Sequence, residues 1–76
     1  MSAIQEPFVI NYLGVSIQVT PLVDNGDMKY IVELPTRTII LEKEFSEEDI
    51  DYWIEAREGQ TSIAEEIGRL IESRLM

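Results

Sequence analysis

The feature that most constrains the fold is an alternation of apolar and polar residues with a period of two from Phe8 to Lys43. Turn-forming residues interrupt it at positions 13–14, 25–26 and 35–36. Because successive side chains of a strand point to opposite faces of a sheet, the pattern predicts antiparallel strands with one buried face. We expect four strands that pair in sequence order, at residues 8–13, 15–23, 28–34 and 37–45.

The three turns allow the register of the sheet to be predicted. Asn25-Gly26 is the strongest hairpin signal, since both residues tolerate the positive φ of a type I′ turn. At Leu13-Gly14 a three-residue bulged loop is an alternative, because Leu fits a type I′ turn poorly. Two-residue turns at all three positions place apolar residues opposite one another on one face, in the pairs Phe8–Val19, Ile10–Ile17, Ile17–Leu34, Val19–Val32, Val23–Met28, Tyr30–Leu41 and Val32–Ile39. This agreement defines the face that the core should cover.

Residues 46–58 fit two structures. A helical spacing of apolar residues after Ser46 indicates a short capped helix. An equally regular alternation predicts a fifth strand at residues 50–56, in which a four-residue loop would place Leu41 opposite Ile54. We favour the strand because this register extends the apolar face without conflict, but the helix is left open.

The last segment predicts an amphipathic helix at residues 62–75. Ser62 and Glu65 have the spacing of a capping box. Apolar residues follow on one helical face, at Ile63, Ile67, Leu70 and Ile71. Gly68 costs about 1 kcal/mol relative to Ala inside a helix, so we expect it to let the helix approach the sheet closely. Residues 1–76 should therefore form a single α+β domain, a meander with this helix packed on its apolar face.

Composition excludes several classes of function. Fifteen Asp and Glu against six Lys and Arg give a formal charge of −9, and the chain has no His and no Cys. Disulfides, thiolate nucleophiles, Ser–His–Asp chemistry and Cys or His metal sites are therefore excluded, and we expect no cofactor, no metal and no enzyme activity. Six scattered basic residues do not suit a nucleic-acid partner. Neither a signal-peptide pattern nor an apolar run of about 20 residues is present, so we expect a cytoplasmic protein without a membrane partner.

Eight acids lie within residues 42–58, and they include Glu44, Glu47, Glu48, Asp49 and Asp51. Their simplest role is a solvated face that keeps a small acidic protein soluble. An acidic decoy or inhibitor that engages a basic partner through residues 42–58 is an alternative. A small carboxylate-dependent enzyme or a metal-binding protein is a weaker alternative, because one sheet and one helix leave little volume for a catalytic cleft.

The face away from the helix carries the most informative residues. Ile31 and Ile40 should be directly opposed there, and Trp53 should lie diagonally from Ile40 if residues 50–56 form a strand. If that segment is helical, Trp53 belongs to the core instead. A sheet covered on one side normally has polar residues on the other, so these three residues predict a contact surface. We therefore expect a small non-catalytic acidic protein that forms a homodimer or binds a protein partner through this open face.

Overall fold

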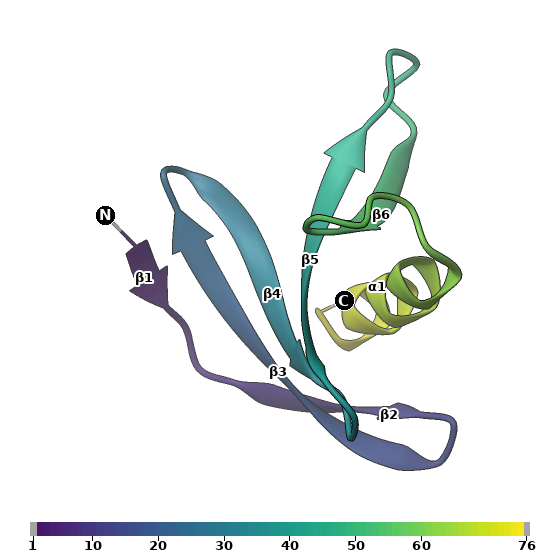
Figure 1. Ribbon diagram of the computed structural model, residues 1–76. Helices are drawn as coiled ribbons and strands as arrows, with labels where there is room; N and C mark the ends of the chain where they lie inside the picture. Colours follow the sequence, from purple (N-terminus) through teal and green to yellow (C-terminus); the bar gives the residue numbers. More distant parts are fainter. Residues whose placement is uncertain (1, 76) are drawn as a thin grey trace.

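The computed structural model describes residues 2–75, which form six strands and one helix (Figure 1). The elements are β1 (Ser2–Ile4), β2 (Phe8–Tyr12), β3 (Val15–Asp24), β4 (Asp27–Glu33), β5 (Thr38–Phe45), β6 (Asp51–Glu55) and α1 (Ser62–Leu75). The strands form one antiparallel sheet in which β3, β4, β5 and β6 are successive neighbours, while β1 and β2 both pair with β3. The predicted α+β meander with a C-terminal helix is confirmed. The strand β1 was not predicted, because three residues are too few to show an alternation.

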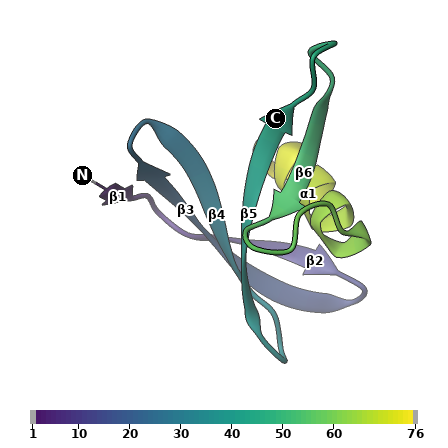
Figure 2. The same ribbon diagram turned by 45° about the horizontal axis from the view of Figure 1, so that its top comes forward.

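The sheet curls around α1, which lies on one of its faces (Figures 1 and 2). The first half of β3 pairs with β2 and its second half with β1, so β2 occupies one edge of the sheet and β6 the other. Both edge strands nevertheless pack against the same helix, together with β5. The curl therefore closes the core between the two edges.

The core consists of side chains from the predicted apolar face and from the helix, namely Ile10, Ile17, Val19, Val32, Ile39, Leu41, Trp53, Ala64, Ile67 and Ile71. Tyr30 from the predicted apolar face of the sheet, and Ile63 and Leu70 from the predicted apolar face of the helix, are partly buried and pack against the core. Burial of such side chains supplies most of the stability of a chain this small, at about 1.5–3 kcal/mol for each large one.

The register predicted for the first three hairpins is confirmed. Val19 lies opposite Val32, and the turn between their strands holds Asn25 at a φ of 53° and Gly26 at 85°. The β2–β3 connection is also a two-residue turn, in which Leu13 adopts a φ of 53° despite its side chain. The bulged three-residue loop considered for this position is therefore absent.

The fifth strand exists, but its register differs from the prediction by one residue. Ser46 donates its backbone N–H to the carbonyl of Ile50 at 2.9 Å, which closes a three-residue loop. Asp49 takes the left-handed conformation in that loop, with a φ of 60°, and the hydroxyl of Ser46 accepts the N–H of Ile50 at 3.2 Å. Asp tolerates this conformation, which is the usual ending of a three-residue hairpin loop. The predicted four-residue loop is therefore wrong.

This shift moves Trp53 to the other face of the sheet. Trp53 lies opposite Lys43, and its side chain is only 2% exposed beneath the helix. A one-residue change of register exchanges the two faces of a strand. The prediction that Trp53 shares the open face with Ile31 and Ile40 is therefore wrong, and Ile54 occupies that face instead.

The helix begins with a different cap from the one predicted. The hydroxyl of Thr61 accepts the N–H of Ala64 at 3.1 Å, so Thr61 is the N-cap and Ser62 is the first helical residue. Glu65 does not complete a capping box with Ser62 but pairs with Arg69 at 2.8 Å. Thr61 was missed because Ser62 has the same cap chemistry one residue later.

Candidate functional site

The two long hairpins of the sheet diverge at their tips. Pairing of β4 with β5 ends at Lys29–Glu42, although the β3–β4 hairpin continues to Asp27 and β5 stays paired with β6 as far as Phe45. The two hairpins splay apart toward their tips in Figures 1 and 2. Between them and the helix lies a cleft of about 560 Å³. We call this space the hairpin cleft.

Large apolar side chains from both hairpins line the hairpin cleft. Met28 and Tyr30 belong to β4, and Phe45 is the last residue of β5. Met28 is 37% exposed and Phe45 is 64% exposed, so both side chains are accessible to a partner. Trp53 and Ile71 line the inner part of the cleft, where the rings of Tyr30 and Trp53 meet at 5.5 Å between centroids.

The cleft residues lie on the same face of the sheet as the core. Met28, Tyr30 and Val32 alternate along β4, and Val32 is fully buried whereas Met28 is exposed. A 14-residue helix is about 21 Å long, and a ten-residue strand spans about 33 Å, so α1 is too short to cover the full length of β3 and its partners. The apolar face therefore continues beyond the helix into the cleft.

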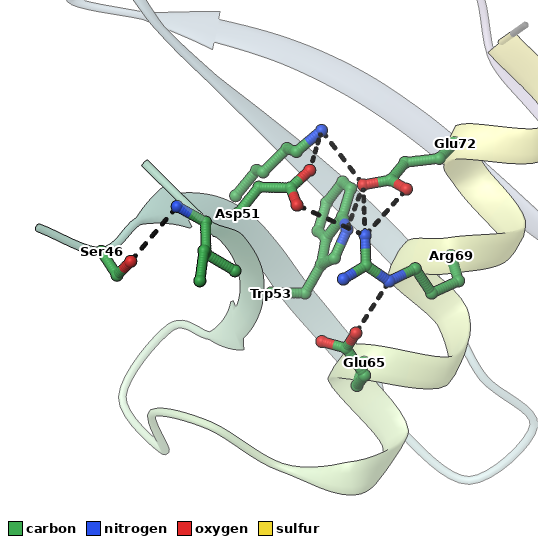
Figure 3. Close-up of polar contacts among 8 residues, drawn as sticks. Ser46, Asp51, Trp53, Glu65, Arg69 and Glu72 are labelled. Atoms are coloured by element: carbon green, nitrogen blue, oxygen red, sulfur yellow. Dashed lines mark hydrogen bonds and ion pairs between the residues drawn. The ribbon is translucent and has the colours of Figure 1, made fainter. Parts of the chain in front are cut away.

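A network of ion pairs closes the inner end of the cleft (Figure 3). The Nζ atom of Lys43 lies 2.9 Å from Asp51 Oδ2 and 3.0 Å from Glu72 Oε1. Trp53 donates its Nε1–H to Glu72 at 3.0 Å, and Arg69 Nη1 lies 3.0 Å from Glu72 Oε2. The network therefore ties β5 and β6 to the C-terminal half of the helix.

The pKa shifts in this network keep every member in its usual charge state. Hydrogen bonds to Asp51 and Glu72 raise the pKa of Lys43, and the bond from Lys43 lowers the pKa of Asp51. Burial alone would raise the pKa of Glu72, but bonds from Lys43, Trp53 and Arg69 outweigh it and lower this pKa. These groups are therefore suited to holding elements together and not to exchanging protons near neutral pH.

The structure keeps two of the three predicted contact residues on the open face. Ile31 and Ile40 are directly opposed there, with Ile31 half-buried and Ile40 exposed. Ile54 is half-buried on the neighbouring strand and replaces Trp53 on this face. The apolar patch of the open face is therefore formed by Ile31, Ile40 and Ile54.

The predicted acidic surface divides into two parts. Asp51 is held by Lys43 and by Arg69, whose Nη1 lies 3.7 Å from Asp51 Oδ1. The remaining four members are exposed and form no ion pair among residues 2–75; they are Glu44, Glu47, Glu48 and Asp49. We call these four the acidic tip, because they lie at the end of the β5–β6 hairpin. This hairpin also exposes Phe45 and Ile50, at 64% and 59%.

Sequence reasoning placed Met28 and Tyr30 on the core face, and it identified neither them nor Phe45 as functional residues. The pattern of alternation cannot distinguish a covered part of an apolar face from an uncovered part. The available signal was the mismatch between the length of the predicted helix and that of the longest strands.

Comparison of the chain with known protein families, with curated proteins and with solved structures finds no match. In the part of the chain that the structure describes, no three acidic side chains are grouped so that they could hold a metal ion. The helix found within residues 2–75 is not long and apolar enough to cross a membrane.

Proposed function

We propose that this chain is a non-catalytic binding protein that holds a segment of a protein partner in the hairpin cleft. The observation that carries the proposal is the presence of two accessible large apolar side chains, Met28 and Phe45, on separate hairpins that face one cleft of about 560 Å³. Concave sites lined by apolar and aromatic side chains are the usual places for ligands to bind, and exposed apolar groups gathered in one place favour a protein contact.

The charge states of the site support binding over catalysis. Acid–base catalysis needs a group whose pKa lies near the working pH. In the cleft, the pKa of Tyr30 is raised by burial and that of Lys43 is raised by its carboxylate partners, whereas the pKa of Glu72 is lowered. All three shifts move the pKa of the group further from neutral pH, so none of these groups is suited to exchanging protons there. This favours a structural network beside a binding surface.

The proposal can be tested with a library of random peptides displayed on phage and selected on the immobilised full chain. We expect enriched peptides whose affinity falls at least tenfold for Phe45→Ser. Ile50→Ser is a matched control, since Ile50 is similarly exposed on the same hairpin but does not line the cleft. Failure to enrich any sequence, or equal losses in the two variants, would contradict a binding role for the cleft.

Self-association through the open face is a second candidate function, favoured by the adjacent side chains of Ile31, Ile40 and Ile54. Their burial in a two-fold dimer would contribute about 1.5–3 kcal/mol each if complete. The charge of −9 opposes association, so added salt should strengthen it by screening. Analytical ultracentrifugation at low and high salt, on wild type and on Ile31→Lys with Ile40→Glu, tests this. A wild type that stays monomeric at high concentration in both salts excludes the dimer.

A further inference from the structure

We infer that the hairpin cleft takes an extended basic peptide that pairs with β5 as an added strand, an inference that rests on the proposed binding function of the cleft. Three features of the cleft favour such a peptide: backbone groups that point into it from the end of β5, its apolar lining, and the carboxylates around it.

The hydrogen bonds of β5 show where its backbone groups point. Ser46 donates its N–H to Ile50, and Ala56 donates its N–H to the carbonyl of Ile40, both at 2.9 Å. The even-numbered residues of β5 therefore form their backbone hydrogen bonds with β6. The odd-numbered residues of β5 direct their N–H and C=O groups toward β4. Since β4 pairs only as far as Glu42, the N–H and C=O of Phe45 face the cleft without a partner strand among residues 2–75.

The end of β4, on the other side of the cleft, also directs a backbone group into it. Leu34 donates its N–H to the carbonyl of Arg37 at 2.9 Å, so even-numbered residues of β4 point toward β5. Met28 is such a residue, and its N–H lies beyond Lys29–Glu42, the last pair of the two strands. The cleft is therefore bordered by unpaired strand edge, to which an extended peptide can add by main-chain hydrogen bonds.

An extended peptide presents alternate side chains to opposite faces. Those on the helix side would enter the space between Met28, Tyr30 and Phe45, which favours apolar residues. Those on the other side would meet a second hollow of about 350 Å³, whose lining includes Asp27, Glu42 and Glu44. The structure thus favours a segment in which apolar residues alternate with residues that suit a carboxylate-lined hollow.

The charge around the cleft favours basic residues at the peptide positions whose side chains face the second hollow. Lys43 lines both hollows, but Asp51 and Glu72 neutralise it at 2.9 and 3.0 Å. Glu44 of the acidic tip already lines the second hollow, and the other three members of the acidic tip add three further carboxylates beside it. Lys29 pairs with Glu42 at 3.8 Å, which leaves Asp27 and the acidic tip to meet a Lys or Arg of the partner. The expected occupant is therefore an alternating apolar and basic segment.

The test is a titration of the full isotope-labelled chain with a blocked hexapeptide of alternating Lys and Val, followed by NMR. We expect the amide signals of Met28 and Phe45 to shift most. Binding should weaken at least tenfold when Glu replaces Lys in the peptide or when Phe45→Ser replaces the wild-type chain, whereas Ile50→Ser should bind as the wild type does. Equal binding of the Glu-containing peptide would overturn the charge argument, and an unchanged affinity for Phe45→Ser would overturn the site.

Two N-methylated peptides test the strand pairing itself. In a strand, all residues on one face direct their N–H groups to the same side. Methylation of the three Val nitrogens and methylation of the three Lys nitrogens should therefore have opposite effects, with one peptide losing at least tenfold in affinity and the other retaining it. Equal binding by both peptides would overturn the pairing.

The outcomes separate this inference from the proposed function. If library-selected peptides bind the cleft but the Lys-Val peptide does not bind, the inference fails and the proposed function stands. If ultracentrifugation without peptide shows a dimer that Phe45→Ser abolishes, a second copy of the chain occupies the cleft, and the inference of a basic peptide is overturned.

Discussion

The indole ring of Trp53 lies directly against the backbone of Gly68 in the middle of α1. A Cβ atom built on Gly68 would lie 2.1 Å from Cγ of Trp53, a distance that no real side chain can keep. The other end of the ring is fixed by the bond from Nε1 to Glu72, one helical turn later. The expectation that Gly68 allows a close approach of the helix to the sheet is therefore confirmed. This contact positions the Trp53 ring, which lines the inner part of the hairpin cleft.

Gly68→Ala should destabilise the fold. Overpacking of a core costs about 1–3 kcal/mol or more, and the clash with Trp53 should exceed the gain of about 1 kcal/mol that Ala brings to a helix. Urea unfolding monitored by circular dichroism measures the difference. Ser73→Ala, at an exposed position of the same helix, is the control and should be neutral or slightly stabilising. A Gly68→Ala chain as stable as wild type would show that the contact can relax.

Thr61→Ala should cost about 1–2 kcal/mol of stability, whereas Ser62→Ala should change it by less than about 0.5 kcal/mol. Thr61 caps the helix and also donates its hydroxyl to Glu55 at 2.6 Å, and the Glu55 side chain is buried. Ser62 is exposed on the first turn. The two free energies of unfolding, measured side by side, decide between the caps, and a larger loss for Ser62→Ala would reverse the assignment.

The stability of the fold should decline in acid partly through Glu72 and Asp51. Their pKa values in the folded chain lie below the ordinary 4.5 and 3.8, so the unfolded chain takes up protons first as the pH falls. The ion pairs therefore stabilise the fold fully above about pH 4.5, and this contribution is lost progressively below it.

Glu72→Gln should accordingly reduce the free energy of unfolding more at pH 7 than at about pH 3. Glu47→Gln is the control, because Glu47 is exposed and belongs to the acidic tip. Urea unfolding at the two pH values gives both differences. A Glu72→Gln effect that is the same at both would mean that the network contributes nothing through its charge.

Val32→Asp and Ile67→Asp should each unfold the chain, because both side chains are fully buried and an unpaired charge would be placed in the core. Val9→Asp is the control, since Val9 is 55% exposed on the face away from the helix. Thermal melts followed by circular dichroism should show a cooperative transition for wild type and Val9→Asp alone. A native-like melt of either core variant would contradict the packing of α1 on the sheet.

The hairpins were predictable because their signals are local. Asn25-Gly26 defines a two-residue turn, and such a turn determines the partner of every residue in the two strands that it joins. The β5–β6 register was missed because the alternation favours a four-residue loop, which would keep Glu55 off the apolar face. In the structure Glu55 lies on that face and is buried, with Thr61 and Arg37 as its partners. The choice depends on the left-handed conformation of Asp49 and on the hydroxyl of Ser46, neither of which the alternation contains.

The hairpin cleft could not be predicted in this way, because it depends on where two strands stop pairing. Met28 and Val32 lie on the same face of β4, yet one is accessible and the other is buried. The difference arises from the curl of the sheet and the finite length of α1, which are properties of the assembled fold.

The short connection after β6 limits the addition of further strands to the sheet once a peptide has bound. Both backbone groups of Glu55 are bonded to Gly59, at 2.8 and 2.9 Å, so the outer edge of β6 is already occupied at its C-terminal end. A peptide added to β5 would lie between the two hairpin tips, with the end of β4 on its other side. We therefore expect a complex of one peptide per chain that ends there, and not a template on which further strands stack into fibres.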